Sequence, residues 1–331
     1  MMRKVFAAML VACVGAVFAN DTMWVPVTYY DFHADNVNYP QGLGDGCLNS
    51  QPHGPWEGSN PEFETHRRPT GCGGKIHPGS GCTSATHWAD LVTGMVQTNL
   101  DAEGKPQASG TTFYNRFVGK WFRPWQPGDY RRPKYAVSCY NGVGFPSDGY
   151  SGDSTCPHDT SFKNIIIKDS LPFIDQISFS TYAESFSNPA GDGMYTYHND
   201  HFFPIDGKGF GNEPWIVNPV DGRGNAFDDH NFSFTLEIIG RFKYSAADNY
   251  VFRFCGDDDV WVFVNRKLAI DLGGIHSALT DSLVLNNIAG SHGLNEGQWY
   301  ELHFFLAERH SGGSYATLMT NLPIGRKRRL R

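Results

Sequence analysis

The second half of the chain carries short apolar runs of strand length, separated at regular intervals by turn residues. Inside these runs β-branched and aromatic residues dominate, often alternating with polar ones, which is typical of strands rather than helices. No strand–helix–strand rhythm and no internal repeat interrupts the pattern. It therefore predicts an all-β fold, an antiparallel β-sandwich or barrel. The expected strands are residues 164–167, 231–244, 249–254, 260–264, 268–272, 299–306 and 315–322.

Composition agrees with a β domain and excludes some partners. Aromatic residues make up 14% of the chain, charged residues only 18%, and there are 37 glycines and 19 prolines, a mixture that suits strands joined by many turns. A formal charge of −7 argues against nucleic acid as a partner. The one basic run, Arg326–Arg331, lies in residues 323–331, which we expect to be a solvated tail.

The first residues resemble a secretory signal. Met1-Met-Arg-Lys4 supplies positive charge, an apolar stretch follows, and Val17-Phe18-Ala19 fits a small-residue cleavage site, so residues 1–19 are expected to be a signal peptide. Cys13 lies in a sequence similar to a lipobox, which leaves a lipoprotein as the alternative. No later segment has the length of a membrane span. We therefore expect a secreted or cell-surface protein.

Cleavage after residue 19 would leave an even number of cysteines, which in an exported protein favours disulfides over metal thiolates. Proximity alone suggests the pairs Cys72–Cys82 and Cys139–Cys156. Five of the six lie in residues 20–160, a loop-rich segment that we expect to wrap around a β domain formed by residues 161–322. In this segment a strand is expected at 24–32, and residues 86–100 are expected to form a short helix or a strand. The six are Cys47, Cys72, Cys82, Cys139, Cys156 and Cys255.

Three consecutive aspartates precede the apolar strand 260–264. Two carboxylates about 4 Å apart repel by roughly 1 kcal/mol in water and several times that when partly buried. A hard cation such as Ca²⁺ would offset that repulsion, because it takes oxygen ligands. The alternative is that backbone amides of the turn cap the aspartates without a metal.

Seven stretches, in order along nearly the whole mature chain, together resemble the fibro-slime family of secreted proteins. That family is similar to the protective-antigen-type, lectin-like β domain, also found in the calcium-dependent lectins of yeast flocculins and epithelial adhesins. The stretches are Val25-Pro-Val-Thr-Tyr-Tyr-Asp-Phe32, Asn60-Pro-Glu-Phe63, Thr160-Ser-Phe-Lys-Asn-Ile165, Phe202-Phe-Pro-Ile-Asp-Gly-Lys-Gly-Phe-Gly211, Cys255-Gly-Asp-Asp-Asp-Val-Trp-Val-Phe263, Asp271-Leu-Gly-Gly-Ile-His276 and Ala307-Glu-Arg-His310.

The resemblance implies a specific calcium site. In those lectins two neighbouring aspartates joined by a cis peptide bind calcium, which in turn holds sugar hydroxyls. The matching pair here is Asp257 and Asp258, with Asp259 in the spacer position before the strand. A late loop, 307–313, would place Glu308 where the lectins have Asn.

Backbone carbonyls of His310 and Gly312 would complete the metal shell that the resemblance implies. A third carboxylate should tighten the ion but leaves less positive charge facing a sugar. The residues expected to line the ligand are Asp257, Asp258, Asp259, Arg309 and Trp261.

Other patterns in the sequence do not indicate a functional site. His276, His292, His303 and His310 lack metal-ligand spacing and are expected to be packed or surface residues. The glycine-rich run 206–211 lacks the strand–helix context of a phosphate cradle and is expected to be a turn. No nucleophile elbow or zinc-protease motif is present, so we expect a binding module rather than an enzyme.

The predicted function is calcium-dependent binding of carbohydrate, a cell-surface glycan or polysaccharide, by a secreted adhesion module. One alternative is a structural component of extracellular slime or fibres, in which calcium only stabilises the fold. The other is a glycoside hydrolase, whose carboxylate pair would meet only in three dimensions.

Overall fold

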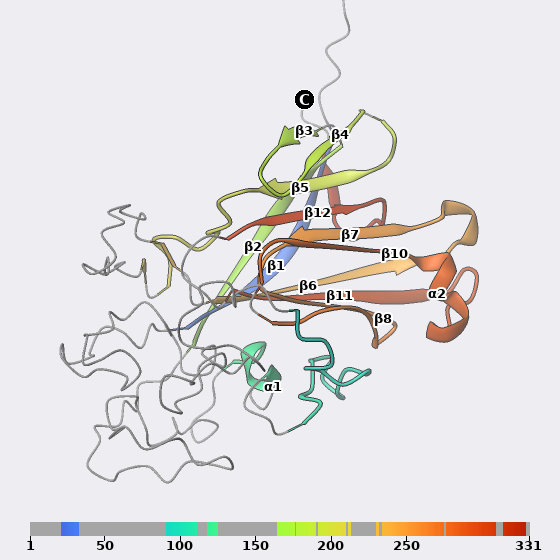
Figure 1. The fold of residues 1–331 in the computed structure, drawn as a ribbon. Coiled ribbons are helices and arrows are strands. Elements are labelled where there is room, and N and C mark those ends of the chain that lie inside the picture. The colour runs from blue at the N-terminus through green and yellow to red at the C-terminus, as the bar shows by residue number, and fades with distance from the viewer. Residues whose placement is uncertain are drawn as a thin grey trace, which may run out of the picture.

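The computed structural model describes residues 21–32, 91–110, 118–124, 164–175, 177–189, 191–209, 211–212, 230–231, 234–274, 276–308 and 314–328. Within them the fold is nearly all β, with two short α-helices (Figure 1). The strands are β1 (Thr22–Phe32), β2 (Asn164–Ile174), β3 (Ile177–Ser180), β4 (Ser185–Asn188), β5 (Tyr195–Asn199), β6 (Phe234–Lys243), β7 (Val251–Gly256), β8 (Asp259–Val264), β9 (Lys267–Leu272), β10 (Leu279–Val284), β11 (Trp299–Glu308), β12 (Ala316–Thr320) and β13 (Arg326–Arg328). The helices are α1 (Val118–Trp121) and α2 (Leu285–His292).

Eleven of the strands form one antiparallel sheet in the order β10-β7-β12-β5-β2-β1-β6-β11-β8-β9, with β13 added beside β1. The end strands β9 and β10 contact one another, so the sheet curls into a near-barrel (Figure 1). Strands β3 and β4 form a separate hairpin. The predicted all-β antiparallel architecture is therefore confirmed.

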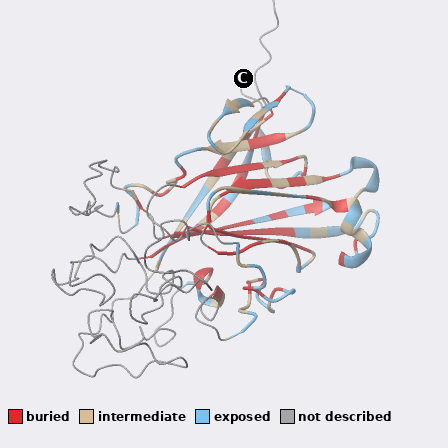
Figure 2. Ribbon diagram, viewed as in Figure 1, coloured by how far each residue is buried: buried red, intermediate tan, exposed pale blue. Residues whose placement is uncertain are grey.

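The inside of the curled sheet holds the main core, and Figure 2 shows buried residues along most of the long strands, whereas β2 is buried only near its end at Leu171 and Phe173. Strand β8 is buried along its whole length. Val260, Val262 and Val264 face the main core, whereas Trp261 and Phe263 face a second core on the outer side of the sheet. The alternation of valines with aromatic residues is thus explained by burial on both faces.

The second core is closed by residues 91–110 and 118–124. Trp121, the last residue of α1, and Phe122, which follows it, both pack against Trp261. Their ring centroids lie 6.3 and 6.4 Å from that of Trp261, respectively. Phe122 also meets Phe305 of β11 edge to face at 4.9 Å. The aromatic side chains of β8 and β11 are therefore buried by a segment far from them in the chain.

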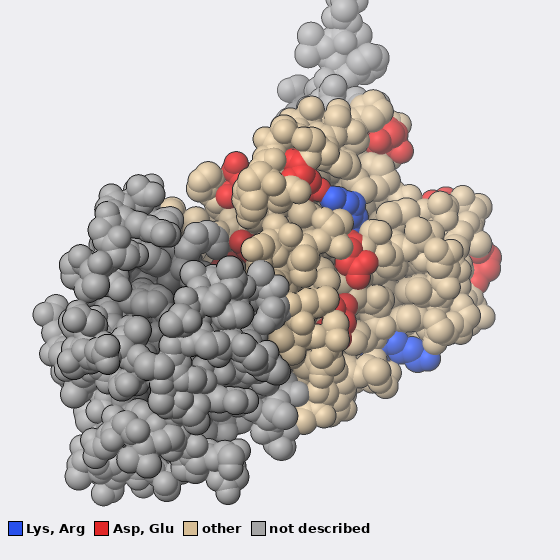
Figure 3. All heavy atoms as spheres, viewed as in Figure 1, with Lys and Arg blue, Asp and Glu red and all other residues tan. Residues whose placement is uncertain are grey.

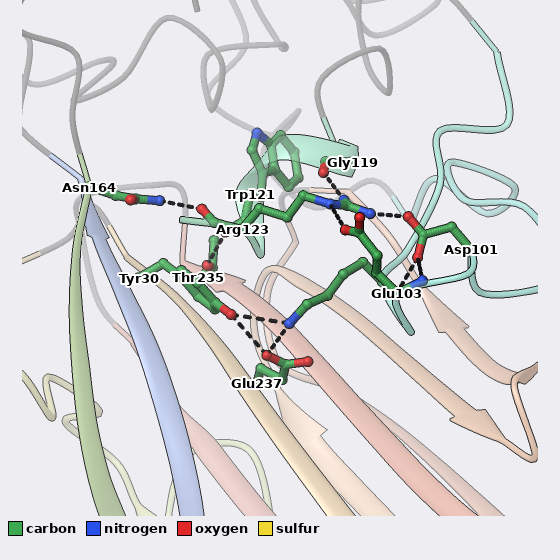
Figure 4. Close-up of polar contacts among 10 residues, drawn as sticks. Tyr30, Asp101, Glu103, Gly119, Trp121, Arg123, Asn164, Thr235 and Glu237 are labelled. Carbon is green, nitrogen blue, oxygen red and sulfur yellow. Dashed lines mark hydrogen bonds and ion pairs between the residues drawn. The ribbon is translucent and has the colours of Figure 1, made fainter. Parts of the chain in front are cut away.

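Charged groups fasten the same segment to the sheet (Figure 4). Lys105 forms an ion pair with Glu237 of β6, and Tyr30 of β1 donates a hydrogen bond to the same carboxylate at 3.0 Å. Arg123 is paired with Asp101 and lies 3.2 Å from Glu103, within the segment itself. Since β1 lies between β2 and β6, part of residues 20–160 forms the centre of the sheet and part covers its outer face.

The strands expected from the sequence all occur, most with small shifts at their ends, but β2 runs to Ile174 and is much longer than the expected 164–167. Residues 91–100 differ, because they form turns and isolated bridges to Ala108 and Lys267 rather than a helix or strand. The expected late loop also begins further on, since β11 continues through Glu308. Strands β3, β4, β5, β10 and β13 and helices α1 and α2 were not expected, and β13 differs from the solvated tail expected over residues 323–331 because Arg326–Arg328 pair with β1.

Candidate functional site

The two predicted calcium ligands form the tight connection between β7 and β8. Strand β7 ends at Gly256 and β8 begins at Asp259, which leaves Asp257 and Asp258 as the linking pair. A Cβ atom on Gly256 would lie 2.4 Å from the carbonyl oxygen of Tyr315, so only glycine allows the strands to approach this closely. The close approach fixes where the aspartate pair emerges from the sheet.

The backbone of this connection differs from the one the resemblance implies. No peptide bond among the described residues is cis, so the bond between Asp257 and Asp258 is trans, unlike the cis bond of the lectins in the resemblance. The reversal is made instead by Asp258, whose φ of +56° lies in the left-handed region that aspartate tolerates better than most residues. The amide of Asp257 donates to the carbonyl oxygen of Tyr315, and that of Asp258 to the carbonyl oxygen of His276.

Glu308 completes a cluster of three acidic residues. It ends β11, and its side chain is buried, with only 1% exposed. Burial, followed by the charges of Asp258 and Asp257, raises the pKa of Glu308 well above its usual range. Its Oε1 atom has no hydrogen-bond partner among the described residues. The structure thus places Glu308 beside Asp257 and Asp258, although it follows Asp258 by fifty residues in the sequence.

Asp257 also has a raised pKa, and in its case the cause is burial. Burial raises its pKa to about 7, and the hydrogen bond that its Oδ1 accepts from the amide of Tyr315, at 2.8 Å, only partly offsets this. In the described part of the chain no group of three or more His, Cys, Asp or Glu side chains is arranged to hold a metal ion. Glu308 thus interacts electrostatically with Asp258 and Asp257, but the three side chains as they lie do not form a metal-binding group.

The remaining predicted site residues fall in three places. Asp259, which was expected to line the ligand, is fully buried, and its Oδ1 accepts a hydrogen bond from the amide of Gly274 at 2.7 Å, so its carboxylate belongs to the fold and not to a binding surface. Trp261 is also fully buried and donates its Nε1 hydrogen to Asp271, which places its ring in the second core and not at a binding surface. Arg309, His310 and Gly312 lie outside the described residues.

The histidines and the glycine-rich run agree with their predictions. His276 places both ring nitrogens near backbone carbonyl oxygens, of Ser277 and Leu272, and is buried. His292 and His303 are buried as well, and burial lowers the pKa of His303. Residues 204–209 form successive turns.

Cys255, the one cysteine inside the described ranges, is buried and carries a free thiol. The expectation that it pairs in a disulfide is wrong, because its neighbours across the sheet are Thr280 and Thr317. The two proposed pairs, Cys72–Cys82 and Cys139–Cys156, lie outside the described residues.

One group of residues beside the carboxylates escaped the sequence analysis. The β3–β4 hairpin carries Glu184, which forms an ion pair with Arg253 of β7 and accepts a hydrogen bond from the hydroxyl of Tyr315 at 3.1 Å. The signal was present in the alternation of Ile177-Ser-Phe-Ser180 and Ser185-Phe-Ser-Asn188 around four turn residues. Short strands rich in serine do not stand out by composition.

The surface around these elements is acidic in places. Figure 3 shows Asp and Glu side chains at several points across one face, with Lys and Arg side chains between them. No helix among the described residues is long and apolar enough to cross a membrane.

Residues 190–327 match the family model of the PA14 domain, a range that includes Asp257, Asp258 and Glu308. This confirms the protective-antigen-type part of the resemblance for these residues, while membership of the fibro-slime family stays a prediction.

Two curated relatives come from Dictyostelium discoideum. The chain is similar to protein psiQ, at 42% identity over 157 residues, 46% of this chain and 14% of that protein. It is also similar to protein psiI, at 44% identity over 135 residues, 41% of this chain and 17% of that protein. The chain thus spans less than a fifth of the length of either relative.

Among solved structures, one match is a PA14 sugar-binding domain from an RTX adhesin. It is 14% identical and covers 43% of this chain and 77% of that one, with a TM-score of 0.22. A TM-score this low gives the match no weight for the fold or the function.

Proposed function

We propose that this protein is an extracellular carbohydrate-binding module of the fibro-slime type, with adhesion as its role and Ca²⁺ held by Asp257, Asp258 and Glu308. The observation that carries the proposal is the buried carboxylate of Glu308, which lacks a partner for Oε1 and lies beside two further acidic residues. The PA14 match across all three residues supports the same site.

The acidic cluster has a charge problem that the described residues do not solve. Two carboxylates about 4 Å apart near a protein surface repel by roughly 4 kcal/mol, and burial adds the cost of removing each charge from water. The raised pKa values of Asp257 and Glu308 are the signature of that cost. Without a cation the site stays folded by binding protons; with one, it can ionise.

The donor set suits calcium. Ca²⁺ takes about six to eight oxygen ligands and favours carboxylates with backbone carbonyls, which is what this turn and the segment after β11 contain. Asp257, Asp258 and Glu308 would supply the carboxylates, and His310 and Gly312 the carbonyls that the resemblance implies. Bound calcium would offset two of the three negative charges of the cluster and offer free coordination positions to neighbouring sugar hydroxyls.

The location of the cluster also favours binding. The acidic pair lies in the connection between β7 and β8, where Asp257 is partly exposed and Asp258 is buried, so a ligand would meet the cluster at Asp257. The predicted signal peptide would deliver the protein to an extracellular space, where calcium and glycans are both available.

The test combines calorimetry with glycan binding on the full mature chain. Titration with CaCl₂ should show one tight site in the wild type, raise the melting temperature and release protons near neutral pH. Glu308→Gln should weaken calcium binding at least tenfold. The matched control is Glu301→Gln, an exposed glutamate on the same strand, which should bind calcium as the wild type does.

Retention on a glycan array, present with calcium and abolished by chelator, is the second expected result. Absence of any calcium-dependent stabilisation would overturn the metal site. Calcium-dependent stabilisation without retention on any glycan or polysaccharide would overturn the carbohydrate-binding function and leave a structural role.

A further inference from the structure

The β3–β4 hairpin holds an aromatic side chain out in solvent. Its turn is fixed by Thr181, whose Oγ1 accepts hydrogen bonds from the amides of Ala183 and Glu184, both at 3.2 Å, and whose own amide donates to the carbonyl of Glu184 at 2.8 Å. Tyr182, at the tip, is 76% exposed, more than any other large apolar or aromatic side chain in the described part of the chain. Such exposure of a ring on a fixed turn calls for an explanation.

The ring of Tyr182 is oriented by its neighbour. It meets the ring of Tyr315 edge to face, with centroids 5.7 Å apart and planes at 69°. Tyr315 is buried, and its hydroxyl contacts Thr181 and Glu184 of the same hairpin. Glu184 is in turn paired with Arg253 of β7, so the hairpin is fastened to the sheet at its tip.

Further ring contacts support the hairpin from below. His198 of β5 stacks on Phe179 at 3.6 Å and meets Tyr315 edge to face at 5.6 Å. Phe179 pairs across the hairpin with Phe186, over which the guanidinium of Arg253 lies at 5.9 Å. The exposed ring is therefore carried on a rigid, stacked support.

The same tyrosine connects the hairpin to the acidic cluster. The amide of Tyr315 donates to Oδ1 of Asp257 at 2.8 Å, while its ring lies against Tyr182. Tyr182 is also within electrostatic reach of that carboxylate: partial desolvation, followed by the charge of Asp257, raises its pKa to about 12. One residue, Tyr315, thus positions both a carboxylate of the cluster and an exposed aromatic ring.

We propose that Tyr182 forms the wall of the carbohydrate site, stacking on the C–H face of a pyranose whose neighbouring hydroxyls point to the Asp257–Asp258 turn. This rests on the proposed function and adds the ligand class to it: a pyranose with adjacent hydroxyls and an apolar face. The face of a phenol ring carries negative charge density, which attracts the weakly positive C–H groups of a sugar. A ring that is already held in place loses little entropy on binding.

Tyr182 lies before residue 190, where the PA14 match begins, so that match does not supply it. The inference comes from the position of the hairpin alone. It also answers the charge objection to a three-carboxylate site, because stacking adds affinity that does not depend on residual positive charge at the cation.

The experiment uses the full mature chain with calcium and a panel of methyl glycosides of glucose, galactose, mannose and fucose, measured by saturation-transfer NMR and calorimetry. For whichever glycoside binds best, Tyr182→Ala should weaken binding about tenfold, whereas Tyr182→Trp should retain it. The calcium affinity and calcium-dependent melting shift of both variants should equal those of the wild type.

Trp299→Ala is the matched control. This exposed aromatic begins the strand that Glu308 ends, nine residues and roughly 30 Å away, so its loss should leave binding unchanged. If Tyr182→Ala binds the glycoside as tightly as the wild type, the stacking inference is overturned and the proposed function stands. If the wild type binds none of the glycosides, the pyranose class is wrong and the inference is overturned, whereas the proposed function is decided separately by retention on the glycan array.

Discussion

Glu237 and Glu308 are both buried glutamates on the neighbouring strands β6 and β11, yet their surroundings differ in one respect. Glu237 is 5% exposed and its Oε2 is paired with Lys105 and with the hydroxyl of Tyr30. Glu308 is 1% exposed, and the charges that act on its carboxylate are those of two more acids, Asp258 and Asp257. Both glutamates leave Oε1 without a partner in the described residues, so the difference is the cation and not the count of hydrogen bonds.

The comparison separates two ways of burying a carboxylate. At Glu237 the chain supplies its own cation from residues 91–110, and the ion pair fastens that segment to the sheet (Figure 4). At Glu308 the described chain supplies only further negative charge. A site of the first kind is complete without a ligand, whereas a site of the second kind reaches its ionised state only when a cation arrives from solution.

Breaking the complete site should have the largest effect. Lys105→Met leaves Glu237 charged and unpaired in a buried position, and we expect it to lower the free energy of unfolding by about 3 kcal/mol or more in urea denaturation. The double variant Lys105→Met, Glu237→Gln should recover most of that loss.

The control for this first prediction is an exposed ion pair. Lys208 and Asp169 lie 2.8 Å apart with side chains about half exposed, at 44% and 48%. Lys208→Met should cost less than about 1 kcal/mol. Equal losses for the two lysines would contradict the contrast between the buried and exposed sites.

The second prediction concerns the incomplete site and its dependence on pH. Asp257 has a folded-state pKa of about 7, above its ordinary value of 3.8, so protons bind more tightly to the folded protein. In chelator, the stability from this group is fully present below pH 3.8 and is lost as the pH rises towards 7, a decline on the order of 2–4 kcal/mol.

Melting temperatures measured from pH 4 to 8 in chelator test this, with Asp257→Asn as the variant that should flatten the decline. Calcium should do the same by compensating the ionised carboxylates. Stability that rises over this range in the wild type, with no difference in Asp257→Asn, would show that the cluster carries no charge conflict.

The smallest expected effect is that of Glu308→Gln, which is compared with Glu237→Gln. Glu308→Gln in chelator should change the free energy of unfolding near neutral pH by no more than about 0.5 kcal/mol, because the raised pKa already favours the neutral acid. Glu237→Gln should cost about 2 kcal/mol, since Lys105 loses its counter-ion. A larger loss for Glu308→Gln than for Glu237→Gln in urea denaturation would reverse the comparison.

The sequence predicted the sheet better than the site. Runs such as Val260–Val264 carry a strong strand signal because burial on both faces demands apolar residues at every position. Helix α2 gave no comparable signal, since the residue before it, Val284, provides no side-chain cap. Hairpin β3–β4 was missed because its strands are four residues long and alternate with serine.

For the site, the sequence indicated which acids belong together but not how the backbone brings them there. The pairing of Asp257–Asp258 with Glu308 followed from resemblance, whereas the left-handed conformation of Asp258 and the strand position of Glu308 depend on the register of β7, β8 and β11. Contacts between residues far apart in the chain could not be predicted from the sequence. Lys105 and Glu237 are 132 residues apart, and no local pattern links them.

The central position of β1 has a consequence for the rate of folding. Tyr30 and its partner Glu237 are separated by 207 residues, so the pairing of β1 with β6 cannot form until most of the chain has been synthesised. Until then an eleven-residue apolar strand has both edges unpaired. Closing so long a loop is slow, and we expect a folding intermediate that is prone to aggregate while β1 waits for β2 and β6.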